Sequence, residues 1–262
     1  MGLGFGGLLR RLAASTLGLH GVRLCESTGS APRLRLGNRE PVRFMDVISL
    51  PLTTEDLNAR QIREVNKLRR QLMVGDQSAQ YATNHRVKSA MAAAVNGTGA
   101  RSVLDWGCGY HPMRGLLDRR EHFVGVDLDP DVVADNLRHG VACLPAHAVP
   151  KMLAGMAFDA IVSVFVFHFR MPTQHIECMV RLIGANGFIL ANVYRRSPES
   201  RLRLMGAFQE RGLQVWSRTD PTNSAADHEF WFIASPRRAH EVGEAVLATT
   251  VERMLEPAPV RP

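Results

Sequence analysis

The sequence has few cysteines and no long apolar run. Its four cysteines, among 262 residues, include no Cys-x-x-Cys pair. Neither a zinc site nor a disulfide framework is therefore indicated, and a reducing compartment is expected. No apolar stretch approaches the ~18 residues needed to cross a bilayer, so stable membrane insertion is not expected. The hydrophobic content of 45% and charged content of 22% are typical of a globular protein.

Acidic residues are scarce in the N-terminal part of the chain. The first 100 residues hold 14 Lys and Arg against 7 Asp and Glu, whereas residues 101–262 hold 18 of each class. The whole net charge of +7 therefore arises before residue 101. Such a region is either a solvated basic extension or a surface that binds phosphate groups, and both interpretations stay open.

The first 25 residues contain no acid at all. Their apolar residues fall at helical spacing, and Arg10 and Arg11 lie on another face. This composition is typical of a mitochondrial transit peptide, but also of a helix that contacts membranes or RNA. We expect a cytoplasmic protein, with the mitochondrial matrix as the alternative.

The rest of the chain divides by pattern. Residues 26–41 are rich in Ser, Gly, Pro and Arg and favour an irregular arm. Helical periodicity follows over residues 53–72 and 84–95. We predict a basic arm or targeting segment over residues 1–52, a domain over 53–236 that includes these helices, and a C-terminal tail over 237–262.

Short apolar runs alternate with helical stretches after residue 101. Buried parallel strands are predicted at 101–107, 122–129, 158–169 and 187–194. Residues 213–220 and 229–235 are suited to a final antiparallel pair. The alternation predicts an α/β fold with a doubly wound, mostly parallel sheet.

A glycine cluster stands where the first strand turns toward a helix. Gly107 and Gly109 would let backbone N–H groups approach a ligand closely. Pro112 occupies the position of the third glycine in a dinucleotide fingerprint, so that motif fails. Asp105, just before the loop, suits a ligand that carries positive charge and has no pyrophosphate. S-adenosylmethionine, with an ammonium and a sulfonium, is such a ligand.

Residues 103–235 resemble the class I S-adenosylmethionine-dependent methyltransferases. The family's first motif is matched by Asp105, Gly107, Cys108 and Gly109, and Asp127 falls where the family binds the ribose hydroxyls with an acid. The resemblance implies a seven-stranded sheet, methyl transfer and S-adenosyl-L-methionine as cofactor. His111 replaces a frequent glycine, and no acid follows the third strand to meet the adenine. Adenine recognition would then fall to backbone groups or to His147.

Two further segments resemble the messenger RNA cap guanine-N7 methyltransferases. In NHRVKSAM (84–91), four positions match the segment that precedes the first motif in that family: Asn84, Val87, Lys88 and Ser89. The resemblance implies that Lys88 contacts the cofactor carboxylate. The stretch FVFHFRM (165–171) matches the segment after the fourth strand through Phe165, His168 and Phe169. His168 and Phe169, nearest the strand's exit, are the candidate catalytic residues.

A capped RNA 5′ end is therefore the predicted partner. Guanine N7 has a free lone pair and needs no general base, whereas an alcohol or phenol would need one. The basic arm and an arginine cluster that includes Arg195 and Arg196 would bind phosphates. Glu229 would contact the guanine edge, as an acid does in the cap family.

Two alternatives remain beside the cap hypothesis. The same enzyme class could act on a small molecule or on mitochondrial RNA. A methyltransferase-like binding or assembly protein without cofactor is the other alternative, suggested by His111 and the missing adenine acid. Tight cofactor binding would separate an enzyme from such a protein.

Overall fold

The computed structural model describes residues 23–25, 33–35, 42–44, 48–50, 55, 57–60, 62–63, 66, 77–119, 121–222, 224 and 227–256. The chain divides into two compact units, residues 1–78 and 79–262. This division differs from the predicted boundary after residue 52. The proposed targeting helix before residue 23 and most of the helix predicted over 53–72 lie outside the described residues.

The first unit contains a small sheet of four three-residue strands. In chain order these are β1 Arg23–Cys25, β2 Arg33–Arg35, β3 Val42–Phe44 and β4 Ile48–Leu50. The strand order is β1-β2-β4-β3. Strand β2 lies within residues 26–41, where the composition favoured an irregular arm. Its main chain pairs with β1 and with β4, and such pairing can form with many side chains.

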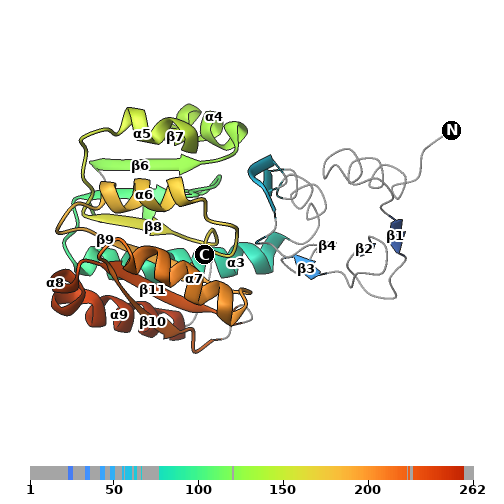
Figure 1. The fold of residues 1–262 in the computed structure, drawn as a ribbon. Coiled ribbons are helices and arrows are strands. Elements are labelled where there is room, and N and C mark those ends of the chain that lie inside the picture. The colour runs from blue at the N-terminus through green and yellow to red at the C-terminus, as the bar shows by residue number, and fades with distance from the viewer. Residues whose placement is uncertain are drawn as a thin grey trace. The chain divides into compact units, whose positions relative to one another are not determined.

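The second unit is built on a seven-stranded sheet (Figure 1). Its strands are β5 Ser102–Trp106, β6 His122–Asp127, β7 Cys143–Pro145, β8 Ala160–Ser163, β9 Phe188–Val193, β10 Gln214–Thr219 and β11 Glu229–Ala234. The order is β10-β11-β9-β8-β5-β6-β7, with β11 antiparallel to both of its neighbours and the other pairs parallel. The predicted doubly wound, mostly parallel seven-stranded α/β sheet is confirmed.

Helices cover both faces of this sheet. The main ones are α3 Gln77–Gly97, α4 Pro130–Arg138, α6 Thr173–Leu182, α7 Pro198–Gln209 and α9 Glu244–Leu255. Shorter helical pieces are η2 Met113–Leu116, η3 Ala146–Ala148, α5 Val149–Met152, α8 Pro236–Arg238 and η4 Ala239–Gly243. One apolar core joins α3 and α9 to the sheet, and a second joins α6 and α7 to it. The alternating faces of each buried strand supply both cores.

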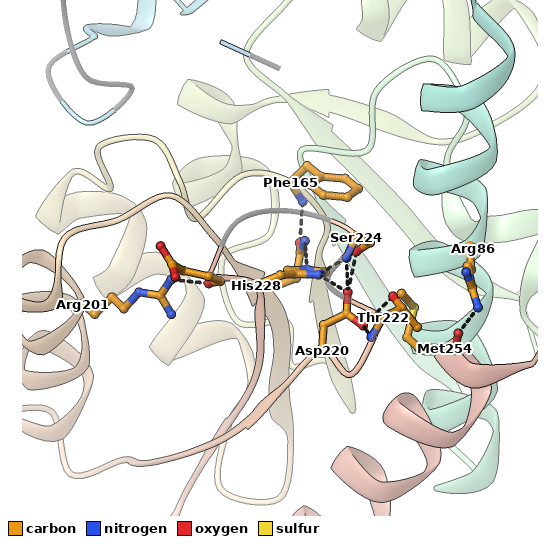
Figure 2. A network of polar contacts seen from close by, with 10 residues as sticks. Arg86, Phe165, Arg201, Asp220, Thr222, Ser224, His228 and Met254 are labelled. Carbon is orange, nitrogen blue, oxygen red and sulfur yellow. Dashed lines mark hydrogen bonds and ion pairs between the residues drawn. The ribbon is translucent and has the colours of Figure 1, made fainter. Parts of the chain in front are cut away.

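The C-terminal tail predicted over 237–262 is wrong for its described part. Helix α9 buries Val246, Leu247 and Met254 in the same core as α3. The guanidinium of Arg86 on α3 donates to the carbonyl of Met254 near the end of α9 (Figure 2). It also donates to the carbonyl of Glu256, directly after the helix. Apolar residues at helical spacing hold this segment against the sheet, so it belongs to the second unit.

Strand β8 ends sooner than its apolar run. The run continues to Phe169, but the strand ends at Ser163, and Phe165 has a left-handed φ of 57°. Such a conformation is uncommon for a residue with a side chain and breaks the extended strand. Residues 164–170 consequently form a turn at the carboxyl edge of the sheet, which we call the β8 loop.

Candidate active site

The glycine loop folds over the end of the neighbouring strand. Gly107 and Gly109 have left-handed φ values of 81° and 64°. The N–H groups of Gly107 and Cys108 both donate to the carbonyl of Val126, at 2.7 and 3.1 Å. These bonds bring the loop from β5 to the carboxyl end of β6, the edge at which ligands bind in such sheets.

Asp105 lies completely buried beneath this loop. Its Oδ2 accepts a hydrogen bond from the N–H of Met113 at 2.8 Å, while its buried Oδ1 has no hydrogen-bond partner among the described residues. Burial raises the pKa of the carboxyl, and the nearby positive charge of Lys88 opposes this. A buried acceptor without a donor fits the binding of a cationic cofactor at the loop.

Lys88 extends from α3 to the same loop. Its ammonium donates to the carbonyl of Cys108 at 2.9 Å and to that of His111. The structure therefore places the Lys88 ammonium at the glycine loop. Contact with a cofactor carboxylate stays a prediction. The adjacent Val87 is part of the apolar core.

Asp127 closes the other side of the loop at the end of β6. Its Oδ2 accepts from the N–H of Gly109 at 3.0 Å and its Oδ1 from that of Asp129 at 2.9 Å. Burial raises its pKa despite these bonds. His147 is exposed in η3, directly after β7, the strand that pairs with β6. Both predicted cofactor residues thus lie at one edge of the sheet.

The side chain of Cys108 packs inside the fold and is not exposed at the surface. Its side chain is fully buried, with its Sγ 3.7 Å from that of Cys143. The hydrogen bond with Cys143 and burial both raise the pKa of the Cys108 thiol. Asn136 of α4 donates to the carbonyl of Gly109 at 2.9 Å. These contacts fix the loop from behind.

The β8 loop packs directly on the glycine loop. A Cβ added at Gly107 would lie 2.2 Å from Cγ2 of Val166. The N–H of Phe165 donates to Oδ1 of Asn192 at 2.6 Å. The segments around Lys88, the glycines and the β8 loop therefore meet in one place.

Arg196 has a different position from the one predicted for a substrate-binding residue. Its side chain is buried, and its Nε and one terminal nitrogen donate to the carbonyls of Phe167 and Phe169, each at 2.6 Å. The remaining terminal nitrogen donates to Ser200. The guanidinium holds the β8 loop in place because its planar fork reaches several acceptors at once. The prediction that Arg196 binds RNA phosphates is corrected.

The two candidate catalytic residues, His168 and Phe169, lie among buried aromatic side chains. The imidazole of His168 is fully buried, with its centroid 3.9 Å from that of Phe169 and 4.4 Å from that of Tyr194. Phe169 is only 7% exposed. Both side chains shape the β8 loop from inside in this conformation, and their direct contact with a substrate stays a prediction.

Glu229 is also occupied within the fold. One carboxylate oxygen pairs with Arg201 at 2.7 Å, and the other accepts from the indole of Trp231 at 2.8 Å. This differs from the predicted contact with guanine, because neither oxygen is left without a partner. Arg195 is half-buried with a left-handed φ of 52°, and its substrate role stays a prediction.

Three polar residues beside the β8 loop were not predicted from the sequence. Asn192 bonds to His228, and His228 bonds to Asp220. All three are buried, and Figure 2 shows the imidazole of His228 between Asp220 and the backbone of Phe165. A polar residue in the fully buried strand β9 was the available signal, since such groups need buried partners.

No group of His, Cys, Asp and Glu suited to a metal ion occurs among the described residues. Within the same residues, no helix is both long and apolar enough to span a membrane.

Residues 104–191 match the family model described as a methyltransferase domain. This match confirms the coarser prediction: the chain has the domain of an S-adenosylmethionine-dependent methyltransferase, with S-adenosyl-L-methionine as cofactor. No curated protein matches the sequence significantly.

Several solved structures are similar to the chain. Magnesium protoporphyrin IX methyltransferase from Synechocystis PCC 6803, with bound cofactor, is 14% identical with a TM-score of 0.46, covering 68% of this chain and 98% of its own. The N-methyltransferase NodS from Bradyrhizobium japonicum WM9 is 14% identical with a TM-score of 0.45, covering 62% and 99%. The methyltransferase domain of a bacterial CtHen1 is 11% identical with a TM-score of 0.46, covering 58% and 99%. These likenesses leave the acceptor open.

Proposed function

We propose that this methyltransferase acts on RNA and transfers the methyl group to N7 of a cap guanine. One observation carries the proposal: the two segments that resemble the cap enzymes meet at the glycine loop. Lys88 bonds to the Cys108 carbonyl, and Val166 packs against Gly107. The order of the motifs along the chain and their meeting in space point to one acceptor site.

The bound cofactor would supply a methyl group already activated on a sulfonium. Transfer is an in-line displacement, so the protein's task is to orient the acceptor and exclude water. Asp105 and Asp127 fix the glycine loop, and Lys88 contributes positive charge beside it. Guanine N7 brings its own lone pair, so no side chain has to remove a proton from it.

The acceptor is tested with purified chain, isotopically labelled cofactor and GpppG-capped RNA. Digestion and mass spectrometry should find labelled 7-methylguanosine. RNA that carries a cap already methylated at N7 is the matched control and should take up no label. Labelling of both RNAs, or of neither, would contradict the cap proposal.

A small molecule is the second candidate acceptor. Arg196 and Glu229, predicted to contact RNA, are held by partners inside the fold. Fewer cationic and acidic groups are then available to an extended RNA at this edge. Label found on a small metabolite from an extract, with no label on either RNA, would favour this alternative. Its compartment would be the cytoplasm or the mitochondrial matrix.

A further inference from the structure

A chain of buried polar groups connects the hairpin of β10 and β11 with the β8 loop (Figure 2). Asp220 follows β10 and His228 precedes β11, and they are 3% and 1% exposed. Nδ1 of His228 lies 2.8 Å from Oδ2 of Asp220. The carboxylate also accepts from the N–H and hydroxyl of Thr222 and from Ser224.

These donors keep Asp220 charged. Burial would raise the pKa of its carboxyl, but the hydrogen bonds from His228, Ser224 and Thr222 together hold it well below its ordinary value. A charged carboxylate accepts hydrogen bonds and cannot donate them. Nδ1 of His228 therefore carries the proton that lies between the two residues.

The Ser224, His228 and Asp220 set is not a nucleophilic triad. In such a triad the hydroxyl and the carboxylate face opposite nitrogens of the imidazole. Here Oγ of Ser224 lies 3.0 Å from Nδ1, the nitrogen that also faces Asp220. The opposite nitrogen, Nε2, faces Asn192 at 2.8 Å. The arrangement excludes activation of Ser224 by this histidine.

The orientation of Asn192 follows from its contact with the backbone. The N–H of Phe165 can only donate, so the atom 2.6 Å from it is the amide oxygen of Asn192. The amide nitrogen then faces Nε2 of His228, which has to accept. Every bond runs in one direction, from the Phe165 N–H through Asn192 and His228 to the Asp220 carboxylate. Successive hydrogen bonds that run in one direction polarise and so strengthen one another.

We propose that Asn192, His228 and Asp220 form a positioning relay that holds Phe165 in its left-handed conformation and so fixes the β8 loop as a wall of the acceptor site. The proposal rests on the proposed function, because it takes the β8 loop to face the methyl acceptor. Phe165 has a φ of 57°, and the next residue, Val166, packs on Gly107. Phe165 therefore determines where the β8 loop lies beside the glycine loop.

The relay requires the neutral form of His228. The groups that face its imidazole among the described residues are Asp220, Ser224, Asn192, and the rings of Phe165, Tyr194 and Phe230. A proton on Nε2 would oppose the amide nitrogen of Asn192. Rotation of the amide would relieve that clash and create another one at the N–H of Phe165.

The relay is tested in the full chain with Asn192→Leu and Asn192→Asp. Leucine removes both bonds, whereas aspartate keeps an oxygen for the N–H of Phe165. Amide hydrogen exchange of Phe165, measured by NMR, should be about 10-fold faster in Asn192→Leu, as expected for a lost hydrogen bond, and close to wild type in Asn192→Asp. Thr219→Val, at an exposed position of the same hairpin, is the matched control and should match the wild type.

A kinetic measurement separates positioning from stability. In Asn192→Leu, kcat should fall by up to about 100-fold, as for a misplaced acceptor, while the Kd for S-adenosylhomocysteine stays unchanged. Equal Phe165 exchange in Asn192→Leu and wild type would overturn the relay, as would parallel losses of kcat and cofactor affinity. If Asn192→Leu does not fold, His228→Leu, which removes the acceptor that faces Asn192, replaces it, and the same faster exchange at Phe165 is expected. If the wild-type chain leaves capped RNA unmethylated, the proposed acceptor is wrong. The amide hydrogen exchange of Phe165 still tests the relay in that case.

Discussion

Gly107 and Val166 lie so close together that no residue larger than glycine fits at position 107 unless Val166 moves. A Cβ at Gly107 would lie 2.2 Å from Cγ2 of Val166, and the φ of 81° adds strain for any side chain. Gly109 has a similar φ of 64° with nothing within 4 Å of its Cβ position. Gly107 is thus required both for its backbone conformation and for the space beside Val166, whereas Gly109 is required for its backbone conformation alone.

Substitution of these glycines by alanine should therefore have unequal effects. Gly109→Ala should cost only the left-handed strain, about 1–2 kcal/mol. Gly107→Ala should lower the free energy of unfolding further, because Val166 has to move. Denaturant unfolding measures both, and Gly107→Ala combined with Val166→Ala should recover the steric part. Equal losses in the two single variants would show that the contact does not matter.

Lys88 should contribute to cofactor affinity. Lys88→Met removes the charge that the ammonium places beside the glycine loop, where it bonds to the carbonyls of Cys108 and His111. Hydrogen bonds to charged groups contribute about 1.5–3 kcal/mol, so affinity for S-adenosylhomocysteine should fall about 10- to 100-fold. Lys151→Met, at an exposed position on α5, is the control. Similar affinities in both variants would remove Lys88 from the cofactor site.

The charged form of Asp105 should lower the free energy of unfolding, although the residue is expected to bind the cofactor. Its pKa is raised by burial, so the protonated form favours the folded state and this advantage is lost as the pH rises through the raised pKa. Asp105→Asn stays neutral. The difference in Tm between Asp105→Asn and wild type should therefore grow as the pH rises above about 4. Thermal unfolding across pH measures it, and a constant difference would contradict the burial argument.

Arg196 should act on the fold rather than on RNA. Arg196→Met removes the bonds to the Phe167 and Phe169 carbonyls and to Ser200. The expected loss is about 3 kcal/mol or more of the free energy of unfolding, because buried carbonyls lose a charged partner. Arg203→Met, at an exposed position in α7, should leave stability unchanged. Weaker RNA binding by Arg196→Met without loss of stability would restore the original prediction.

The sequence predicts those parts of the site that depend on local spacing. Asp105, Gly107 and Gly109 follow one strand, and Asp127 ends the next, so their meeting is a consequence of parallel topology. The long-range contacts were not predictable in the same way. Asn192 and His228 lie 36 residues apart and meet only because β9 and β11 pair.

Two errors have physical reasons. Arg196 stands in an arginine-rich stretch that resembles a phosphate-binding surface, and nothing local reveals that its guanidinium turns inward. Helix α9 had a visible signal in its spaced apolar residues Val246, Leu247 and Met254. Where such a helix packs depends on its long-range contacts with α3 and the sheet, which the sequence does not show.

Methyl transfer by this protein requires that it bind the cofactor, and calorimetric titration of the full chain with S-adenosylhomocysteine measures this binding. We expect one binding site per chain, lost in Asp105→Ala and in Asp127→Ala while circular dichroism shows both variants folded. If the wild-type chain does not bind S-adenosylhomocysteine, the proposed cofactor site is wrong and the domain lacks methyltransferase activity.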